Sequence, residues 1–409
     1  MDYPAFPESH ALAVRPHWGL DREITFLNHG SFGACPRPVL EAQTRLREQM
    51  EREPVRFFVR ELEPLFDAAR GELAAFVGAD AEDLAFVPNA TAGVNTVLRS
   101  VELGPGDELL TTDHEYNACR NALEAAAARS GARVVVASVP FPIGSEDEVV
   151  EALVGAVTRR TRLALVDHVT SQTGLVLPIG RIVGELQGRG VDVLVDGAHA
   201  PGMVPLDLRA LGAAYFTGNC HKWICAPKGA ALLYVRRDRQ GGVRPLAISH
   251  GANSPRGDRS RFRLELDWTG TFDPTPFLCV PEALRFMGGL LPGGWAALMA
   301  HNRRTALAAR ALLCEALGCV PPSPEGMIGS MAAIPLPPGE GGAPPESPLY
   351  MDPLQDALLG RWGVEVPVIP WPAAPGRLLR ISAQIYNERA DYERLVAGLR
   401  GAGCALRGT

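Results

Sequence analysis

Lysine is almost absent from this sequence, and cysteine, long apolar runs and basic clusters are all sparse. The eight cysteines of the 409-residue chain form no CxxC pair, and no apolar run is long enough to span a membrane. A net charge of −6 argues against a nucleic-acid-binding surface. The first twenty residues lack the basic start and apolar core of a secretory signal. We therefore expect a reduced, cytoplasmic protein with no nucleic-acid partner and no membrane partner.

Only two of the 40 basic residues are lysines, Lys222 and Lys228. Because arginine is used almost everywhere else, a retained lysine indicates a position where a guanidinium group cannot substitute. Arginine stays protonated in proteins, whereas a buried lysine amine can lose its proton and act as a nucleophile or base. Two leftover surface lysines are the alternative, but their proximity in the sequence favours a functional segment.

Short apolar runs alternate with helical stretches from about residue 61 to residue 282. This alternation predicts an α/β domain with a mostly parallel sheet, helices on both faces and functional loops at the carboxyl edge of the strands. One helix is expected from the apolar spacing between Leu62 and Phe76, ending at Gly78. The expected strands are Leu84–Val87, Glu108–Thr111, Arg133–Val139, Leu163–Val166, Val191–Val195, Ala214–Thr217 and Ala230–Val235.

The sequence on either side of this domain has a different character. After residue 283, a helix-rich stretch over Gly294–Leu317 leads into a Pro/Gly-rich segment, 335–348, which predicts a surface loop. Strand and helix signals then return, including 378–385. We expect 61–282 to be a large domain, 283–409 to be a smaller C-terminal domain, and 18–60 to pack with the smaller one.

Two motifs place charged side chains after consecutive strands of the large domain. Asp196 ends the strand in VDVLVDGAHAPG, and Lys222 follows the next strand in GNCHKWICAPKG. Alone, the aspartate could be a helix cap, a metal ligand or a partner for a ring nitrogen. Together, the two residues could hold a pyridoxal 5'-phosphate (PLP) ring, the lysine through a Schiff base and the aspartate by keeping the pyridine nitrogen protonated.

A third motif could bind the phosphate of such a cofactor. After the strand that ends at Val87, the segment 88–95 turns into a helix, and its small residues leave backbone amides accessible to an anion. Thr91 adds a hydroxyl donor. Taken alone, a threonine near a helix N-terminus explains this pattern equally well. No metal site is expected, because the chain has neither an HExxH motif nor a cysteine cluster.

Six motifs occur together in an order that is typical of a known family. They are FLNHGSFGACP (26–36), FVPNATAGVNTVL (86–98), DHEYNA (113–118), DHVTSQTG (167–174), DGAHAPG (196–202) and GNCHKW (218–223). Over about 20–280 the sequence resembles the class V aminotransferases, which are fold type I PLP-dependent enzymes, and among them the isopenicillin N epimerase-like proteins. A weaker match lies at 380–382. The resemblance implies a seven-stranded large domain, a small α+β domain and a homodimer.

The resemblance also assigns roles to individual residues. Lys222 matches the Schiff-base lysine, Asp196 the partner of the pyridine nitrogen, and Arg380 the arginine that binds the substrate carboxylate as a fork. Tyr116 takes the position of a residue that stacks on the cofactor ring. The other matches to cofactor contacts are Ala90, Thr91, Ser171, His199, Asn219, His221 and, reaching a neighbouring subunit, Thr271.

The substrate side of the site carries a weaker signal. His29 either lines the site entrance and contacts substrate, or is a loop histidine with a local hydrogen bond. By resemblance, the segments 29–33, 56–60 and 248–256 would contact the distal end of a substrate. Cysteine desulfurases of this family carry a reactive cysteine ahead of the carboxylate-binding arginine, but 361–379 contains none. A persulfide-forming desulfurase is therefore not expected.

The resemblance implies an enzyme that acts at the α-carbon of an amino acid or a related substrate through an external aldimine. Reprotonation on the opposite face would make it an epimerase, which we favour. Loss of a β-substituent would make it a C–S lyase, and reprotonation on the cofactor an aminotransferase. Epimerisation needs a base and a second acid, for which Lys222 and Tyr116 are the candidates. A PLP-binding regulatory or assembly protein is the non-enzymatic alternative.

Overall fold

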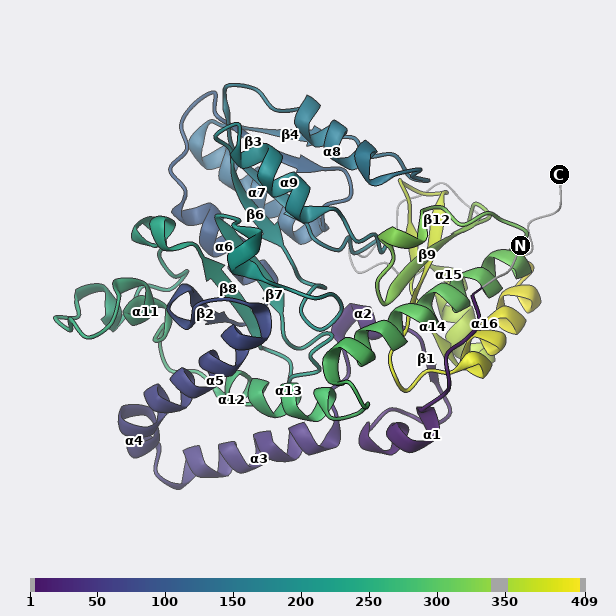
Figure 1. Cartoon of the computed structure of the whole chain (residues 1–409), viewed down its shortest axis with the longest axis horizontal. Coiled ribbons are helices and arrows are strands. Elements are labelled where there is room, and N and C mark those ends of the chain that lie inside the picture. Colours follow the sequence, from purple (N-terminus) through teal and green to yellow (C-terminus); the bar gives the residue numbers. More distant parts are fainter. Residues whose placement is uncertain (1–3, 340–351, 405–409) are drawn as a thin grey trace.

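A seven-stranded and a three-stranded β-sheet lie side by side in the molecule, each with its own helices (Figure 1). The structure is a computed structural model that describes residues 4–339 and 352–404. Most of the predicted loop 335–348 lies outside the described residues, and its first two residues belong to a strand of the smaller sheet. No helix among the described residues is both long enough and apolar enough to cross a membrane.

The larger sheet has seven strands in the order β2-β8-β7-β6-β5-β3-β4. Strand β8 pairs antiparallel with both of its neighbours, and all other pairs are parallel. Helices cover both faces, so the central strands are buried along their length, and the predicted mostly parallel sheet is confirmed. In chain order the strands are β2 (Leu84–Val87), β3 (Glu108–Thr112), β4 (Arg133–Ala137), β5 (Thr161–Asp167), β6 (Asp192–Asp196), β7 (Tyr215–Asn219) and β8 (Ala231–Val235).

The helices of this region form two layers. One face of the sheet shares its core with α5 (Leu62–Val77), α8 (Glu146–Gly155), α9 (Ile179–Gln187) and α13 (Val280–Gly288). The opposite face packs against α6 (Ala90–Ser100), α7 (Asn117–Ser130) and α11 (Arg261–Leu266). Helix α5 ends where Gly78 adopts a left-handed conformation, as the sequence predicts. The short helices are α4 (Pro54–Arg56), α10 (Leu208–Leu211) and α12 (Thr275–Leu278).

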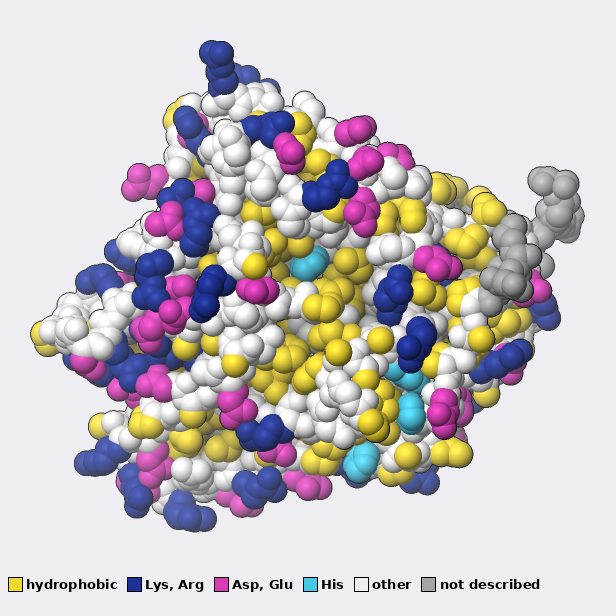
Figure 2. Space-filling model, in the orientation of Figure 1, with side chains coloured by type: hydrophobic (Ala, Val, Ile, Leu, Met, Phe, Trp, Pro, Cys, Tyr) yellow, Lys and Arg dark blue, Asp and Glu magenta, His cyan; other side chains and the backbone are white. Residues whose placement is uncertain are grey.

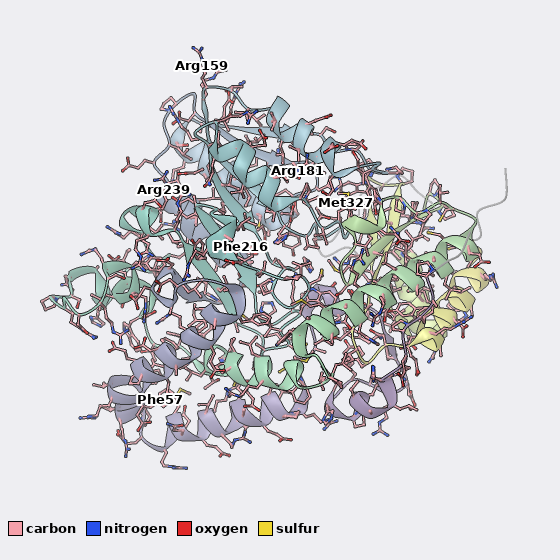
Figure 3. The ribbon with its side chains drawn as sticks, in the orientation of Figure 1. Phe57, Arg159, Arg181, Phe216, Arg239 and Met327 are labelled. Atoms are coloured by element: carbon pink, nitrogen blue, oxygen red, sulfur yellow. The ribbon has the colours of Figure 1, made fainter. Side chains whose placement is uncertain are left out.

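The strand ends at the middle of the large sheet are held by close packing on Phe216, which lies on β7 (Figure 3). A Cβ atom on Gly197 would lie 2.1 Å from the Phe216 ring, so only glycine lets the turn after Asp196 approach β7 this closely. Asp196 is in register with Asp167 on β5 and Thr217 on β7. Three neighbouring strands therefore reach the carboxyl edge at the same level.

The smaller region is built on an antiparallel sheet in the order β11-β12-β9. Its core is formed by apolar residues of that sheet and of three helices, among them the 24-residue α14, which also contacts α13 of the larger region (Figure 1). The elements are α14 (Gly294–Leu317), β9 (Met331–Leu336), α15 (Pro353–Trp362), β10 (Val364–Glu365), β11 (Val368–Pro370), β12 (Arg377–Ser382) and α16 (Arg389–Gly401).

The N-terminal segment 18–60 contacts both regions. Its strand β1 (Thr25–Phe26) pairs in parallel with β10, which attaches it to the smaller region. Its helix α3 (Arg37–Arg52) buries Val39 and Met50 in the core of the larger one. Ahead of β1 lies the short α1 (Ala11–Val14). On the face in Figure 2, hydrophobic side chains gather near the middle and charged side chains lie mainly towards the margins.

Gly33, which follows α2 (His29–Phe32), fixes the N-terminal segment against the loop that carries Lys222. Its φ is +69°, and a Cβ atom there would lie 2.1 Å from the carbonyl oxygen of His221. The Gly33 carbonyl accepts a hydrogen bond of 3.0 Å from Nζ of Lys228. The second lysine of the chain therefore anchors this segment beside the first.

We predict that Gly33→Ala lowers the free energy of unfolding by about 2 kcal/mol or more, because the left-handed backbone is costly for alanine and the opposing atom is backbone. Gly71→Ala is the matched control, since Gly71 lies on α5 with open space around it. That substitution should raise stability by up to about 1 kcal/mol. Urea unfolding measures both values, and equal effects would contradict the role of Gly33.

Candidate active site

The carboxyl ends of β6 and β7 meet the first turn of α6. Asp196 is the last residue of β6 and Asn219 the last of β7, and Lys222 follows in the next loop. The Asn219 side-chain oxygen accepts a hydrogen bond of 2.9 Å from the amide of Ala90, the first residue of α6. Thr91 comes next, half-buried, in the turn whose amides have no partners within the helix. The structure thus brings three of the predicted motifs to one edge of the sheet.

Lys222 is partly accessible, but its amine is enclosed by protein. Nζ lies 3.1 Å from Nε2 of His199, which is buried. Burial, and then the positive charge of Arg380, lower the pKa of Lys222 to about 7, even though the nearby charge of Asp196 acts in the opposite direction. A large fraction of the amine is therefore neutral at physiological pH, as a nucleophile or base requires.

Asp196 is 2% exposed and lies within electrostatic range of Lys222. Burial raises its pKa, whereas hydrogen bonds and the charge of Lys222 act in the other direction. One carboxylate oxygen accepts the amide of Ala198 at 2.9 Å, and the other accepts the thiol of Cys119 at 3.0 Å. Glu115, Cys119 and Asp196 have side-chain atoms close enough together to be ligands of one metal ion. Among the described residues they are the one such set of three.

Arg380, on β12 of the smaller region, is 3% exposed. Its guanidinium donates to the Ser171 carbonyl at 2.6 Å and to the Ser31 hydroxyl at 2.8 Å. No ion pair within 4–339 and 352–404 joins it to a carboxylate, and burial lowers its pKa to about 10. A buried cation that lacks an anionic partner is costly, so this side chain is suited to bind an anionic ligand.

Tyr116 directly precedes α7 and is 42% exposed, within electrostatic range of Arg380. Ser171 is brought to the site by its bonds to that arginine. Thr271 is exposed, and no hydrogen bond in the described part of the chain joins it to Lys222 or Arg380.

Two of the predicted histidines support the main chain around Lys222. His29 is fully buried, with Nδ1 2.8 Å from the Tyr386 hydroxyl and Nε2 3.0 Å from the Lys222 carbonyl, and burial lowers its pKa to about 3. Both ring nitrogens are therefore occupied within the protein, which agrees with a loop histidine whose hydrogen bonds are satisfied. His221 donates from Nδ1 to the Ala230 carbonyl at 3.0 Å, and burial lowers its pKa to about 4.

Sequence reasoning missed three residues at this edge. Gln172 follows Ser171, and its side-chain oxygen is buried without a hydrogen-bond partner. Glu115 and Cys119 lie beside Asp196. Gln172 and Glu115 belong to recognised motifs, so the motifs themselves could have indicated them. Cys119 lies outside the recognised motifs, so the sequence did not indicate it. Only the packing of α7 on the sheet brings its thiol to Asp196.

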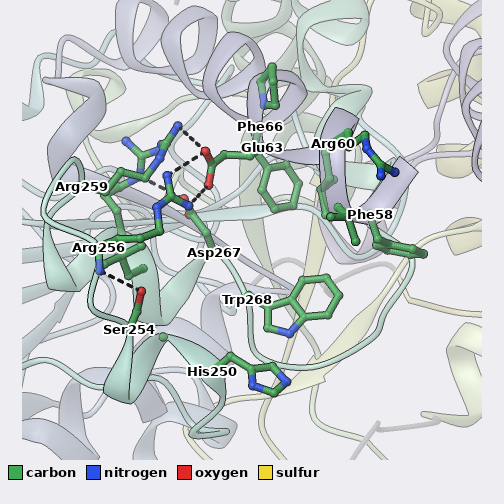
Figure 4. A pocket seen from close by; sticks show the side chains of 16 residues that line it. Phe58, Arg60, Glu63, Phe66, His250, Ser254, Arg256, Arg259, Asp267 and Trp268 are labelled. Carbon is green, nitrogen blue, oxygen red and sulfur yellow. Dashed lines mark hydrogen bonds and ion pairs between the residues drawn. The ribbon is translucent and has the colours of Figure 1, made fainter. Parts of the chain in front are cut away.

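A cavity of about 420 Å³ lies between α5 and the segment before α11 (Figure 4). Phe58 and Trp268 line one side of it, and on the other Glu63 joins Arg256 and Arg259. The cavity combines parts of 56–60 and 248–256, two segments that the resemblance places at the distal end of a substrate. Lys222 is not among its lining residues.

Known proteins resemble this chain over nearly its whole length. A family model described as aminotransferase class-V matches residues 34–309. An isopenicillin N epimerase of Amycolatopsis lactamdurans is 40% identical, covering 95% of this chain and 97% of that protein. A probable chloroplastic L-cysteine desulfhydrase of Arabidopsis thaliana is 32% identical, covering 93% and 83%. A crystal structure of a cystine C–S lyase with cysteine persulfide has a TM-score of 0.76 at 22% identity, covering 94% and 99%, which confirms the predicted fold type I architecture.

The residues at this edge fit PLP. Buried polar atoms without a hydrogen-bond partner within the described residues include His199 Nδ1, Gln172 Oε1 and Arg380 Nε. Such atoms are seldom left unpaired unless a bound group or water satisfies them. Lys222 would hold the aldehyde carbon, Asp196 the ring nitrogen, and the first turn of α6 the phosphate.

With only two lysines, the site of cofactor attachment can be identified directly. We predict that borohydride treatment of the PLP-loaded protein labels Lys222 and leaves Lys228 unlabelled, because the lowered pKa of Lys222 provides a neutral amine. Peptide mass spectrometry measures the label. Lys222→Ala should lose it and Lys228→Ala should keep it. A label on Lys228 in the unaltered protein would be incompatible with this assignment.

Proposed function

Because this chain belongs to the class V aminotransferase family of PLP-dependent enzymes, we propose that it is an epimerase that inverts the α-carbon of an amino acid or amino-acid-derived substrate. The similarity to isopenicillin N epimerases supports this proposal, since a second one, from Streptomyces clavuligerus, is 36% identical and covers 93% of this chain. The substrate would be isopenicillin N or a compound of the same class.

The observation that carries the proposal is the combination of a neutral amine with a buried guanidinium that, within the described residues, forms no ion pair with a carboxylate. The α-carboxylate of an amino acid would supply the missing charge beside Arg380, held by two parallel hydrogen bonds. This orients the α-hydrogen towards the Lys222 amine, whose pKa of about 7 suits a general base. PLP, when bound, supplies an electron sink that makes the α-proton acidic enough to remove.

Inversion also requires a proton donor on the face opposite Lys222. Tyr116 is the candidate, because its ring lies near Arg380 and remains accessible to a substrate. A phenol hydroxyl is among the side-chain groups that can donate a proton as a general acid. The Lys222 amine would remove the proton, and the Tyr116 hydroxyl would return one to the other face.

A C–S lyase that acts by β-elimination is the second candidate. Relatives named L-cysteine desulfhydrase in Arabidopsis thaliana are 30–32% identical, so the same residues could support this outcome. An aminotransferase would need the proton to return to the cofactor instead. A desulfurase is not supported, because the region from α15 to β12 that precedes Arg380 carries no cysteine in 361–379. A purely PLP-binding protein would not need a base and an anion site together.

We further propose that the enzyme acts as a homodimer in the cytoplasm. Thr271 is exposed, which would let it reach the phosphate bound by a neighbouring subunit. Large apolar side chains are also exposed, including Phe32 at 68%, Val59 at 72% and Ile248 at 63%. A partner surface would bury these side chains if they form a contiguous patch. The cavity beside Trp268 would then be available to the distal end of a substrate in the other subunit.

Turnover in deuterated water distinguishes the candidate reactions. With a panel of amino acids and isopenicillin N, the epimerase should give α-deuterated product of inverted configuration, whereas a lyase would release pyruvate and ammonia. Tyr116→Phe should reduce inversion by about 100-fold or more while PLP binding and α-deuteration with retention persist, because Lys222 still exchanges the proton. NMR and chiral chromatography measure both. Unchanged inversion in this variant would remove Tyr116 from the proposed mechanism.

Arg380→Lys should raise KM for the amino acid about tenfold with a smaller change in kcat, because an ammonium cannot make two parallel bonds to a carboxylate. Arg377→Lys is the matched control on the same strand, where the arginine pairs with Asp352 at 3.0 Å. Its KM should stay within about twofold of the unaltered enzyme. Steady-state kinetics measure both, and equal KM values for the two variants would contradict carboxylate binding by Arg380.

A further inference from the structure

Two buried carboxyl groups that have no part in the proposed reaction lie beside Asp196. Together with Asp196 they form a layer of acidic groups. The neighbouring strands β3, β5 and β6 each deliver one carboxyl group to it. Glu115 comes just after β3, Asp167 ends β5 and Asp196 ends β6, with exposed fractions of 6%, 3% and 2%. Asp167 and Asp196 are directly opposite each other in the parallel pair, so their side chains point to the same face of the sheet.

The hydrogen bonds within this layer are unequal. Asp196 accepts two, from the Ala198 amide and the Cys119 thiol. Oxygen Oε1 of Glu115 and Oδ2 of Asp167 are buried without any partner among the described residues. Glu115, Cys119 and Asp196 each offer an atom within 4.8 Å of the other two. Three carboxyl groups on neighbouring strands in a dry environment cannot all be ionised, and a buried oxygen that accepts no hydrogen bond does not stabilise a negative charge.

We propose that Glu115 and Asp167 remain protonated and that Cys119 orients Asp196, so that the layer carries a single negative charge and carries it on Asp196. Glu115, Asp167 and Cys119 are positioning residues, because they act on the ring nitrogen of PLP only through Asp196. The inference rests on the proposed function for the role of Asp196. It goes beyond that function in assigning a proton to each of two side chains that touch neither cofactor nor substrate.

The distribution of the charge follows from the groups that face each carboxyl. Burial, and then the charge of Asp196, raise the pKa of Asp167 well above its usual range. Burial likewise raises the pKa of Glu115, the charge of Asp196 raises it further, and the hydrogen bond of 3.2 Å from the Thr111 hydroxyl acts in the opposite direction. The nearby Lys222 favours a charge on Asp196 and on Asp167, but only Asp196 also has two hydrogen-bond donors. If Glu115 ionised, repulsion would protonate Asp196, and the ring nitrogen would lose its anionic partner.

A metal ion explains the same atoms less well. The Cys119 sulfur and the Asp196 oxygen are 3.0 Å apart, a hydrogen-bond distance. Two such ligands of one tetrahedral zinc ion would be separated by about 3.5 Å. A thiol that donates to a carboxylate therefore accounts for the spacing without an ion.

Infrared spectroscopy of the apoprotein tests the protonation directly. At neutral pH the unaltered protein should show the carbonyl band of protonated carboxyl groups, and Glu115→Gln and Asp167→Asn should each remove part of it. Glu124→Gln, an exposed residue on α7 paired with Arg120, is the matched control and should leave the band unchanged. Absence of the band in the unaltered protein, or its persistence at full strength in both variants, would overturn the proposal.

The pH dependence of folding provides a second test. A carboxyl whose pKa is raised in the folded state contributes stability that is complete below its unfolded pKa, near 4, and is lost as pH rises towards the folded value. Relative to Glu115→Gln, the unaltered apoprotein should therefore lose up to tenfold in its folding equilibrium constant per pH unit between about pH 5 and 8. Urea unfolding measures this ratio. A ratio that does not change with pH would contradict a proton on Glu115.

The role of Cys119 is tested by PLP affinity. Cys119→Ala should weaken PLP binding about tenfold, because a hydrogen bond to a charged group is lost, and Cys119→Ser should restore most of it. Absorbance titration measures both, and equal affinities of the two variants would overturn the orienting role. The infrared and unfolding readouts need neither cofactor nor substrate. A chain that shows the protonated carboxyls but no epimerisation would therefore contradict the proposed function and leave this inference intact.

Discussion

Charged groups are confined to a small, nearly dry volume at the carboxyl ends of the central strands, and the chemistry of this protein depends on that confinement. Burial disfavours every charge there, so each group is neutral, paired or prepared for a ligand. The pKa of Lys222 is lowered, and Asp196 accepts hydrogen bonds from two donors. Arg380 forms no ion pair with a carboxylate within the described residues, and its pKa is lowered as well. A PLP ring with an attached amino acid would supply complementary charges to all three.

The geometry of this volume depends on segments that are far apart in the sequence. Strand β12 of the smaller region delivers Arg380, and the N-terminal segment delivers Ser31 to the same guanidinium. Gly33 lies against the backbone of His221, and Lys228 binds the Gly33 carbonyl. His29 links the Tyr386 hydroxyl to the carbonyl of Lys222. The loop that carries Lys222 is therefore fixed by contacts of its backbone with Gly33 and His29 of the N-terminal segment.

Most of the large sheet and the central pair of site residues were predictable from local sequence. Buried parallel strands appear as short apolar runs, and β2 has the predicted bounds while β4 ends two residues earlier. The scarcity of lysine and the spacing of Asp196 and Lys222 indicated a PLP site without knowledge of the fold. The position of Cys119 was not predictable, because it depends on the angle at which α7 packs on the sheet. The partners of His29 were not predictable either, since they come from two segments that are far from it in the sequence, 222–225 and 384–386.

The sequence by itself determined the order of strands and helices, the two lysines from which we propose the reactive one, and the family to which the chain belongs, because these are properties of short segments and their spacing. Only the tertiary structure decided which charges share one dry volume. The pKa of Lys222, the burial of Arg380 beside Ser171 and Ser31, and the acidic layer that includes Asp196 all arise from burial and long-range contact. Electrostatic energies depend on distance and on the exclusion of water, and neither is encoded in any local segment of the chain.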